Sequence, residues 1–127
     1  MHVNIIHDHR QLKVYQKAFS LSMKIYELSK TFPKEELYSL TDQIRRSSRS
    51  VCSNIVEAFR RRIYPRSFAS KLNESEAEAA ESQNWLDFAL ECKFINPEIH
   101  CSCRKAYDEI IGMLVNMRRS ANKWGLK

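Results

Sequence analysis

Apolar residues recur along the chain at intervals of three and four, which is the spacing of one face of an α-helix. The pattern predicts four helical segments separated by short breaks. No segment alternates strictly between apolar and polar residues, as a half-buried strand would, so we expect no strand. The sequence therefore predicts an all-α protein.

The first predicted helix runs from about Arg10 to Lys30. Its two neighbouring apolar stripes cover more of the circumference than the roughly 100° that one core contact needs. One stripe holds Leu12, Tyr15, Phe19, Met23 and Tyr26, and the other holds Val14, Ala18, Leu21, Ile25 and Leu28. We interpret Lys13, Lys17 and Lys24 as its solvated face.

The second predicted helix follows a break at Phe32-Pro33, because proline disfavours helical geometry in the residue before it. It begins at Ser39, with Asp42 three residues later in a spacing that resembles a capping box, and runs to about Arg61. Its core stripe consists of Ile44, Ser48, Val51, Ile55 and Phe59.

A third helix is predicted after Pro65, with a seam that repeats in alternating steps of four and three. The seam consists of Phe68, Leu72, Ser75, Ala79, Ser82, Leu86 and Ala89. Its small middle residues permit close approach of a neighbouring helix. The later turns also carry apolar surface that points away from the seam, at Trp85, Phe88 and Cys92.

The fourth predicted helix has Asn96 as N-cap, Pro97 at its first position and Glu98 at the favourable end of the helix dipole. Its seam consists of Ile99, Cys103, Ala106, Ile110, Met113, Met117 and Trp124. Short connections favour an antiparallel up-down-up-down four-helix bundle. We expect a single domain over residues 1–127, with residues 1–9 as a flexible N-terminal arm.

Length and composition fit one helical core. A chain of 127 residues is close to the modal domain size, and 2 Gly and 3 Pro leave little turn chemistry for a many-stranded β fold. The surplus apolar surface on the first and third helices predicts self-association, because soluble monomers usually avoid large apolar patches. The alternative is a monomer with a few exposed aromatic side chains.

The opening residues, MHVNIIHDHR, lack the apolar stretch of a secretory signal. No apolar run approaches the ~18 residues of a membrane helix. We therefore expect a cytoplasmic protein that makes no membrane contact. In that compartment the 4 cysteines are reduced thiols rather than a disulfide framework.

The net charge of +6 is distributed unevenly. Residues 41–66 hold seven basic groups, all arginine, and two carboxylates, whereas residues 67–94 hold two basic and six acidic groups. The planar guanidinium group suits phosphate, and Tyr64 among these arginines could stack on an unpaired base. The candidate nucleic-acid-binding residues are Arg45, Arg46, Arg49, Arg60, Arg61, Arg62 and Arg66. The alternative is a solvated face, neutralised by Glu57 or by the acidic third helix.

The other clusters give weaker signals for chemistry. Three carboxylates share a face of the third helix, Glu74, Glu78 and Glu81, but no histidine completes a di-metal pattern. Residues two apart on a helix point about 200° apart, so His100, Cys101 and Cys103 cannot hold one ion there. The run His7-Asp8-His9 could bind metal only weakly. We expect no metal and no cofactor.

No sequence motif indicates catalysis. The chain has no glycine-rich phosphate loop, no H-E-x-x-H and no serine nucleophile elbow. Asn54 and Glu57 are three residues apart, on what we expect to be the polar side of the second helix. Structural roles fit them better than catalytic ones: Asn54 as a cap or a bridge between helices, and Glu57 as an ion-pair partner of an arginine. We expect no enzyme activity.

The segment from Ser39 to Phe59 resembles a known family in Gln43-Ile44-Arg45-Arg46, Ser50-Val51, Asn54-Ile55 and Glu57. It resembles the four-helix-bundle proteins encoded in intervening sequences of bacterial large-subunit rRNA genes, which include the accessory proteins of diversity-generating retroelements. The residues 12–18, 32–36 and 72–90 are also similar to this family, so the resemblance covers nearly the whole chain.

This resemblance implies a ring-like homopentamer with a basic surface that binds nucleic acid and, in the retroelement branch, a reverse transcriptase. It supports Arg45 and Arg46 as contacts and supplies no catalytic residue. Family members commonly carry Gly after the motif's Glu, whereas Ala58 follows Glu57 here. We therefore expect the second helix to continue without interruption into Arg60, Arg61 and Arg62.

Two functional hypotheses follow. The first is a non-catalytic, homo-oligomeric accessory protein that contacts RNA or DNA phosphates through the arginine-rich face, with little recognition of the nucleotide sequence. The second is a protein-interaction adaptor that docks a partner through Trp85, Phe88 and Trp124.

Overall fold

All secondary structure in the residues that the computed structural model describes, 6–125, is helical. The elements are η1 (His9–Gln11), α1 (Lys13–Ser29), η2 (Lys34–Glu36), α2 (Leu40–Arg60), α3 (Pro65–Glu91), α4 (Pro97–Arg119) and α5 (Ala121–Trp124). No strand occurs within that range. The predicted all-α class is confirmed.

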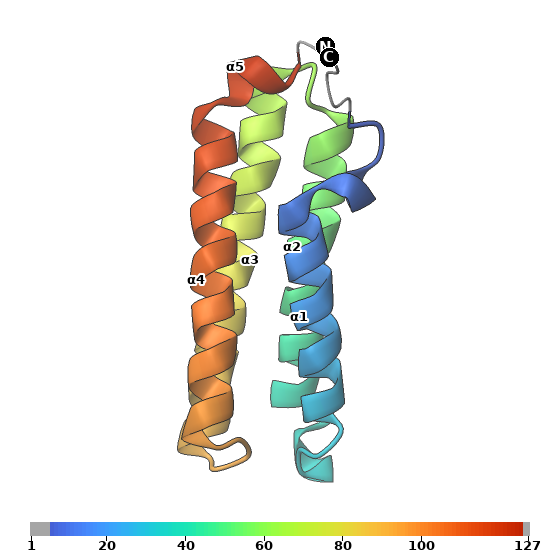
Figure 1. The fold of residues 1–127 in the computed structure, drawn as a ribbon. Coiled ribbons are helices and arrows are strands. Elements are labelled where there is room, and N and C mark those ends of the chain that lie inside the picture. The colour runs from blue at the N-terminus through green and yellow to red at the C-terminus, as the bar shows by residue number, and fades with distance from the viewer. Residues whose placement is uncertain (1–5, 126–127) are drawn as a thin grey trace.

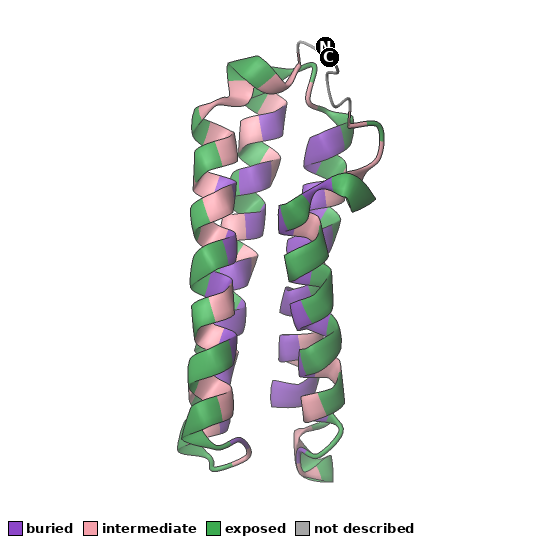
Figure 2. Ribbon diagram, viewed as in Figure 1, coloured by how far each residue is buried: buried purple, intermediate pink, exposed green. Residues whose placement is uncertain are grey.

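The four long helices lie side by side and form a helical bundle (Figure 1). Helix α2 packs on α3, α3 packs on α4, and α1 packs on both α2 and α4. The α1–α2 and α3–α4 connections lie at one end of the bundle, and the α2–α3 connection lies at the other end beside α5 (Figure 1). The buried positions face the interior of the bundle (Figure 2).

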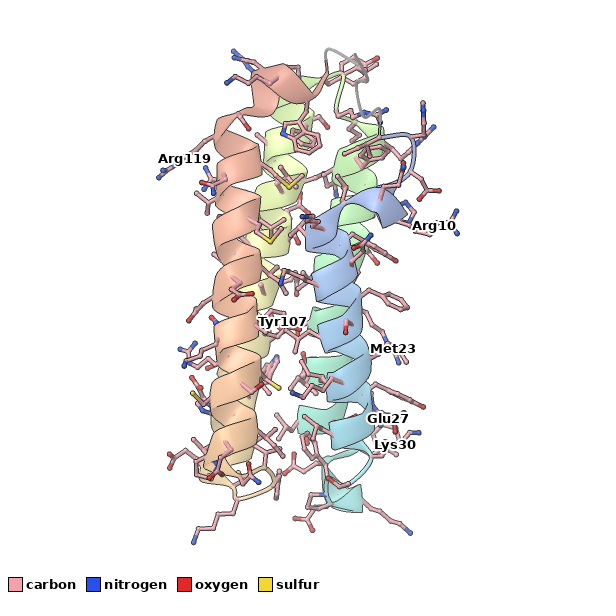
Figure 3. The ribbon with its side chains drawn as sticks, in the orientation of Figure 1. Arg10, Met23, Glu27, Lys30, Tyr107 and Arg119 are labelled. Carbon is pink, nitrogen blue, oxygen red and sulfur yellow. The ribbon has the colours of Figure 1, made fainter. Side chains whose placement is uncertain are left out.

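The predicted core stripes of α2 and α3 are confirmed, because every residue of both stripes is buried. On α1 only the second stripe turns inward. Leu12 is the one buried member of the first stripe, while Phe19 is 50% and Met23 46% exposed. Met23 accordingly lies on the outer side of α1 in Figure 3. The extra apolar surface expected on this helix is therefore present.

The buried face of α4 differs from the predicted seam. Its buried residues are Cys103, Tyr107, Ile110 and Leu114, whereas Met113, Met117 and Trp124 are only half-buried. The seam prediction missed Tyr107 and Leu114, which each lie one position after a predicted seam residue, Ala106 and Met113. The Tyr107 hydroxyl is fully buried without a hydrogen-bond partner among the described residues, and burial raises the pKa of this phenol.

Several helix ends depart from the predicted ones. Helix α1 begins at Lys13 rather than Arg10, because residues 9–11 form η1. Asp8 caps η1: its carboxylate accepts from the Arg10 backbone N–H at 2.8 Å, and the Arg10 guanidinium lowers the pKa of Asp8 to about 2. Residues 1–5 of the expected arm lie outside the described residues. The fourth helix ends at Arg119, and α5 follows it.

The capping box expected between Ser39 and Asp42 at the start of α2 is not formed. Ser39 is the N-cap residue but makes no side-chain capping bond to the helix. Glu36 takes this role instead: its Oε1 accepts from Ser39 Oγ at 2.6 Å and from the Leu40 N–H at 3.2 Å. At the far end α2 passes Ala58 without interruption and stops at Arg60, one residue before the predicted end at about Arg61. The expected further continuation through Arg61 and Arg62 is wrong.

Two other helix ends follow local rules. The Asn96 side chain accepts from the Ile99 N–H at 2.8 Å, as predicted for the N-cap of α4. Helix α3 ends in a Schellman motif, in which the Phe94 N–H donates to the Ala89 carbonyl at 2.8 Å and the Lys93 N–H to the Leu90 carbonyl at 2.9 Å. This motif places Lys93 at φ 64°, in the left-handed region.

The contact between α2 and α3 is built on small side chains. Ser75, Ala79 and Ser82 of α3 are 0% exposed. The Oγ atoms of Ser47 and Ser82 lie 2.7 Å apart, and Ser75 Oγ donates to the Val51 carbonyl at 2.8 Å. These bonds satisfy the buried hydroxyls and let the two backbones approach closely.

Replacing Ala79 by Leu tests this close contact. We expect the free energy of unfolding to fall by about 3 kcal/mol, because a larger side chain forces α2 and α3 apart. The matched control is Ala77→Leu, at an exposed position on the same helix, which should change it by less than about 0.5 kcal/mol. Urea denaturation measures both, and equal effects would contradict the proposed packing.

Replacing Lys93 by Gly tests the left-handed turn after α3. Glycine adopts a positive φ without steric cost, whereas a residue with a Cβ is destabilised there by about 1 kcal/mol. We expect Lys93→Gly to raise the free energy of unfolding by up to about 1 kcal/mol in the same assay. A decrease in stability would show that this turn does not keep the left-handed conformation.

Candidate nucleic-acid interface

The seven candidate arginines occupy two groups along α2 and the turn after it. The first group, Arg45, Arg46 and Arg49, lies in the first half of α2, and the second group, Arg60, Arg61, Arg62 and Arg66, surrounds the connection to α3. Eleven residues separate Arg49 from Arg60, which is about 16 Å along a helix. The arginines therefore form two patches along α2 rather than a single cluster.

Arg45 joins the first group to helix α1. Its Nε donates to Ser29 Oγ at 2.8 Å, and its guanidinium carbon lies 4.9 Å from the centre of the Tyr26 ring. Arg49 lies 5.6 Å from the same ring centre, and Lys30 Nζ lies 4.9 Å from it. Three cations thus gather around one aromatic ring, which holds positive charge at the α1–α2 seam.

Arg62 in the second group is engaged in the fold. Its guanidinium carbon lies 3.9 Å from the centre of the Phe59 ring, and Nη1 donates to the Phe59 carbonyl at 2.8 Å. The Arg62 backbone N–H donates to the same carbonyl at 3.3 Å, so Arg62 holds the C-terminal end of α2 with both its backbone and its side chain. A Cβ at Gly125 would lie 2.7 Å from the Arg62 carbonyl oxygen, so only glycine fits there.

The five remaining arginines are exposed to solvent. They are Arg46, Arg49, Arg60, Arg61 and Arg66. Within residues 6–125 none of them forms an ion pair with a carboxylate. Tyr64 and Ile63, which lie between them in the sequence, are each 62% exposed. This end of α2 therefore presents guanidinium groups together with an accessible aromatic ring.

The nearby carboxylates have other partners. Glu57 lies 2.9 Å from Lys71 Nζ, which lowers the pKa of Glu57, and the charge of Arg61 adds a smaller effect in the same direction. The expected interaction of Glu57 with an arginine is therefore present only as this weaker effect, without an ion pair in residues 6–125. Glu76 accepts from Arg118 Nε of α4 at 2.6 Å. Glu78 has a raised pKa because of burial and the neighbouring Glu81, an effect that the positive charge of Arg46 partly offsets.

The residues considered for other chemistry make structural contacts. Asn54 is buried rather than on a polar side, and its Nδ2 donates to the Ser50 carbonyl at 3.0 Å. His100 Nε2 lies 2.7 Å from Asp87 Oδ1, while Cys103 is buried and Cys101 exposed. In the described part of the chain, no group of three metal-ligating side chains could hold an ion.

The aromatic surface expected on α3 is present in part. Phe88 is 53% exposed and its ring centre lies 5.8 Å from that of Trp85. Both line a groove of about 380 Å³ with Cys92 and with Tyr38, which is 90% exposed. Trp124 lies elsewhere, because α5 packs its ring 5.7 Å from that of Phe68.

Sequence reasoning missed Tyr38 because it lies outside every periodic segment. It also missed the groove itself, since the groove depends on the residues after η2 meeting the later turns of α3.

Among residues 6–125, no helix combines the length and the apolar composition that a membrane span requires.

Comparison with known proteins places this fold in a family. A solved structure similar to the chain is a protein of unknown function from the S23 ribosomal protein family of Bacteroides thetaiotaomicron VPI-5482. The TM-score is 0.77 at 28% sequence identity, covering 84% of this chain and 96% of that one. No curated protein matches the chain. The family model for the 23S rRNA-intervening sequence protein matches residues 10–116. The chain therefore belongs to the 23S rRNA-intervening sequence protein family.

Proposed function

We propose that this chain is a non-catalytic, homo-oligomeric accessory protein that binds the phosphate backbone of RNA or DNA. The single observation that carries the proposal is the set of exposed arginines on α2 and the following turn, which form no ion pair with a carboxylate in the described residues, while Glu57 on the same helix pairs with Lys71. The family name, which refers to 23S rRNA, points to RNA as the first ligand to test.

The contact chemistry explains what such a surface does. Guanidinium groups donate paired hydrogen bonds to phosphate oxygens, which provide affinity without reading the base sequence. The exposed ring of Tyr64 adds a platform on which an unpaired base stacks. Arg62 belongs to the folded end of α2, and Arg45 shares its guanidinium with Ser29 and Tyr26, so the exposed arginines carry most of the binding.

Assembly is the second part of the proposal. We propose that each chain folds as an up-down-up-down four-helix bundle and that several chains form a homo-oligomer in the cytoplasm. The family resemblance implies a homopentamer. Half-exposed Phe19 and Met23 on α1 and Phe88 on α3 provide apolar surface for self-contact. Several copies of a weak basic patch then bind one long nucleic acid with increased avidity.

A protein-interaction adaptor is the second candidate function. The groove lined by Tyr38, Trp85 and Phe88 favours it, because exposed aromatic side chains are enriched at interfaces. Under this function the arginines meet an acidic partner surface. A reverse transcriptase, which the resemblance to retroelement accessory proteins implies, is one such partner.

Charge reversal tests the arginine surface. We expect Arg46→Glu/Arg49→Glu and Arg60→Glu/Arg61→Glu each to weaken binding of a labelled RNA hairpin and a matched DNA duplex. The log–log slope of affinity against salt should fall by about 0.9 for each duplex phosphate that the variant no longer neutralises.

The matched control for these variants is Lys34→Glu/Lys93→Glu, which makes the same charge change at exposed positions outside both arginine groups. It should retain the wild-type slope. Equal slopes for the control and both arginine variants would contradict the assigned surface.

Native mass spectrometry tests the assembly. We expect a mass of several times the 15.0 kDa chain, and a shift toward the monomer on Phe19→Glu/Phe88→Glu because charges oppose burial of these faces. Lys34→Glu/Lys93→Glu should leave the mass unchanged. A wild-type monomer would contradict self-association.

A further inference from the structure

A groove runs between α1 and α4, on the opposite flank of α1 from the Tyr26–Arg45 seam. Its volume is about 500 Å³. From α1 it is lined by Lys13, Gln16, Lys17, Ser20, Leu21 and Lys24, and from α4 by Ser102, Ala106 and Glu109. The three lysines expected to form a solvated face therefore share one concave surface.

The groove exists because the residues along this seam are polar or small. On α1 the positions 13, 17, 20 and 24 follow the same steps of four and three as the buried seam of α3, but hold lysine and serine. On α4 they meet Ser102 and Ala106, whose side chains are too short to fill the space. Only Leu21 provides a large buried apolar side chain at this surface.

The charge of the groove is positive. Three ammonium groups face one carboxylate, that of Glu109, which lies 3.3 Å from Lys17 Nζ. Lys24 Nζ donates to Ser102 Oγ at 3.4 Å. Lys13 has no ion-pair partner within residues 6–125. Two lysines thus keep a full positive charge without a carboxylate on this surface.

The dimensions of the groove suit one strand. Lys13 and Lys24 are eleven residues apart, about 16 Å along the helix, so they are far enough apart to contact different phosphates of one strand. Packed helix axes lie about 10 Å apart, so the groove is narrower than a nucleic-acid duplex. The lining holds no aromatic ring, so the bases have no platform there and the backbone is the part that fits.

We propose that the α1–α4 groove is a second nucleic-acid site, in which Lys13, Lys17 and Lys24 hold the phosphodiester backbone of a single strand. It is separate from the arginine surface on α2 and does not depend on it. A phosphodiester strand fits better than an acidic peptide, because docked peptides need apolar anchor pockets and this groove offers one leucine and one alanine.

The test uses the full-length chain and labelled 12-nucleotide poly-uridine and poly-deoxythymidine, titrated at several salt concentrations. Lys13→Glu/Lys24→Glu should weaken binding of both strands and lower the log–log salt slope by about 1.4, because each of the two lysines neutralises one phosphate at about 0.7 per contact. The control Lys34→Glu/Lys93→Glu should keep the wild-type slope. Equal behaviour of the two double variants would overturn the proposal.

A second variant works in the opposite direction. Glu109→Gln removes the one carboxylate of the groove and releases Lys17, so we expect strand binding to tighten by about threefold. Unchanged or weaker binding would overturn the role of the groove. Circular dichroism melting checks the fold of each variant, and Lys13→Gln/Lys24→Gln replaces the Glu pair if that pair fails to fold.

Competition separates the possible ligands. A large excess of inorganic phosphate or poly-glutamate should displace the strand only weakly. Displacement by phosphate at the concentration at which the strand itself binds would show a small-anion site, and equal displacement by poly-glutamate would show a peptide site. Either result overturns the proposal.

The arginine surface is tested separately in the same titration. Weakened strand binding in Arg46→Glu/Arg49→Glu but not in Lys13→Glu/Lys24→Glu supports the α2 surface and overturns the groove. The reverse result supports the groove and overturns the proposed function of α2.

Discussion

The close packing of α2 against α3 through small side chains is the interaction on which the rest of the structure depends. Ser75, Ala79 and Ser82 let α2 lie directly against α3, and the Ser47–Ser82 contact at 2.7 Å satisfies hydroxyls that burial would otherwise destabilise. This packing fixes the rotation of α2. Its apolar stripe then faces inward and its arginines face outward, so the same packing creates both the core and the charged surface.

The acidic helix α3 only partly offsets the charge of the arginine-rich α2, through the effect of Arg46 on Glu78. Carboxylates of α2 and α3 pair with Lys71 and with Arg118 of α4, and Glu81 accepts from the Trp85 indole at 3.1 Å. The exposed guanidinium groups of α2 and the following turn therefore have no ion-pair partner in residues 6–125.

The sequence predicted the parts of the fold that depend on periodicity. The seams of α2 and α3 and the Asn96 cap follow from spacing and local hydrogen bonding. The buried face of α4 did not, since Tyr107 and Leu114 are buried one position after the predicted seam residues Ala106 and Met113. The expected continuation of α2 through Arg61 and Arg62 was also wrong, because the Arg62 side chain packs over the Phe59 ring at the end of the helix. The spacing of residues within one helix does not predict contacts that a different helix or the following turn makes with it.

The candidate site was predictable as a set of residues but not as a surface. Clustering of arginine in residues 41–66 singled out the candidate residues, whereas only the packed structure separates exposed Arg60 and Arg61 from Arg62, which binds the end of α2. The lysines of α1 show the same limit. Their spacing indicates one face of a helix, but the groove arises only when α4 places short side chains opposite them.

Salt-dependent binding of the wild-type protein tests the central claim most directly. The titration uses nucleic-acid-free protein with a labelled structured RNA and a matched DNA duplex. The account predicts that both bind at low salt and that affinity falls steeply as salt rises, with a log–log slope of several units, because several phosphates are contacted at once. Absence of binding to either ligand at low salt would contradict it and would leave the aromatic groove as the functional surface.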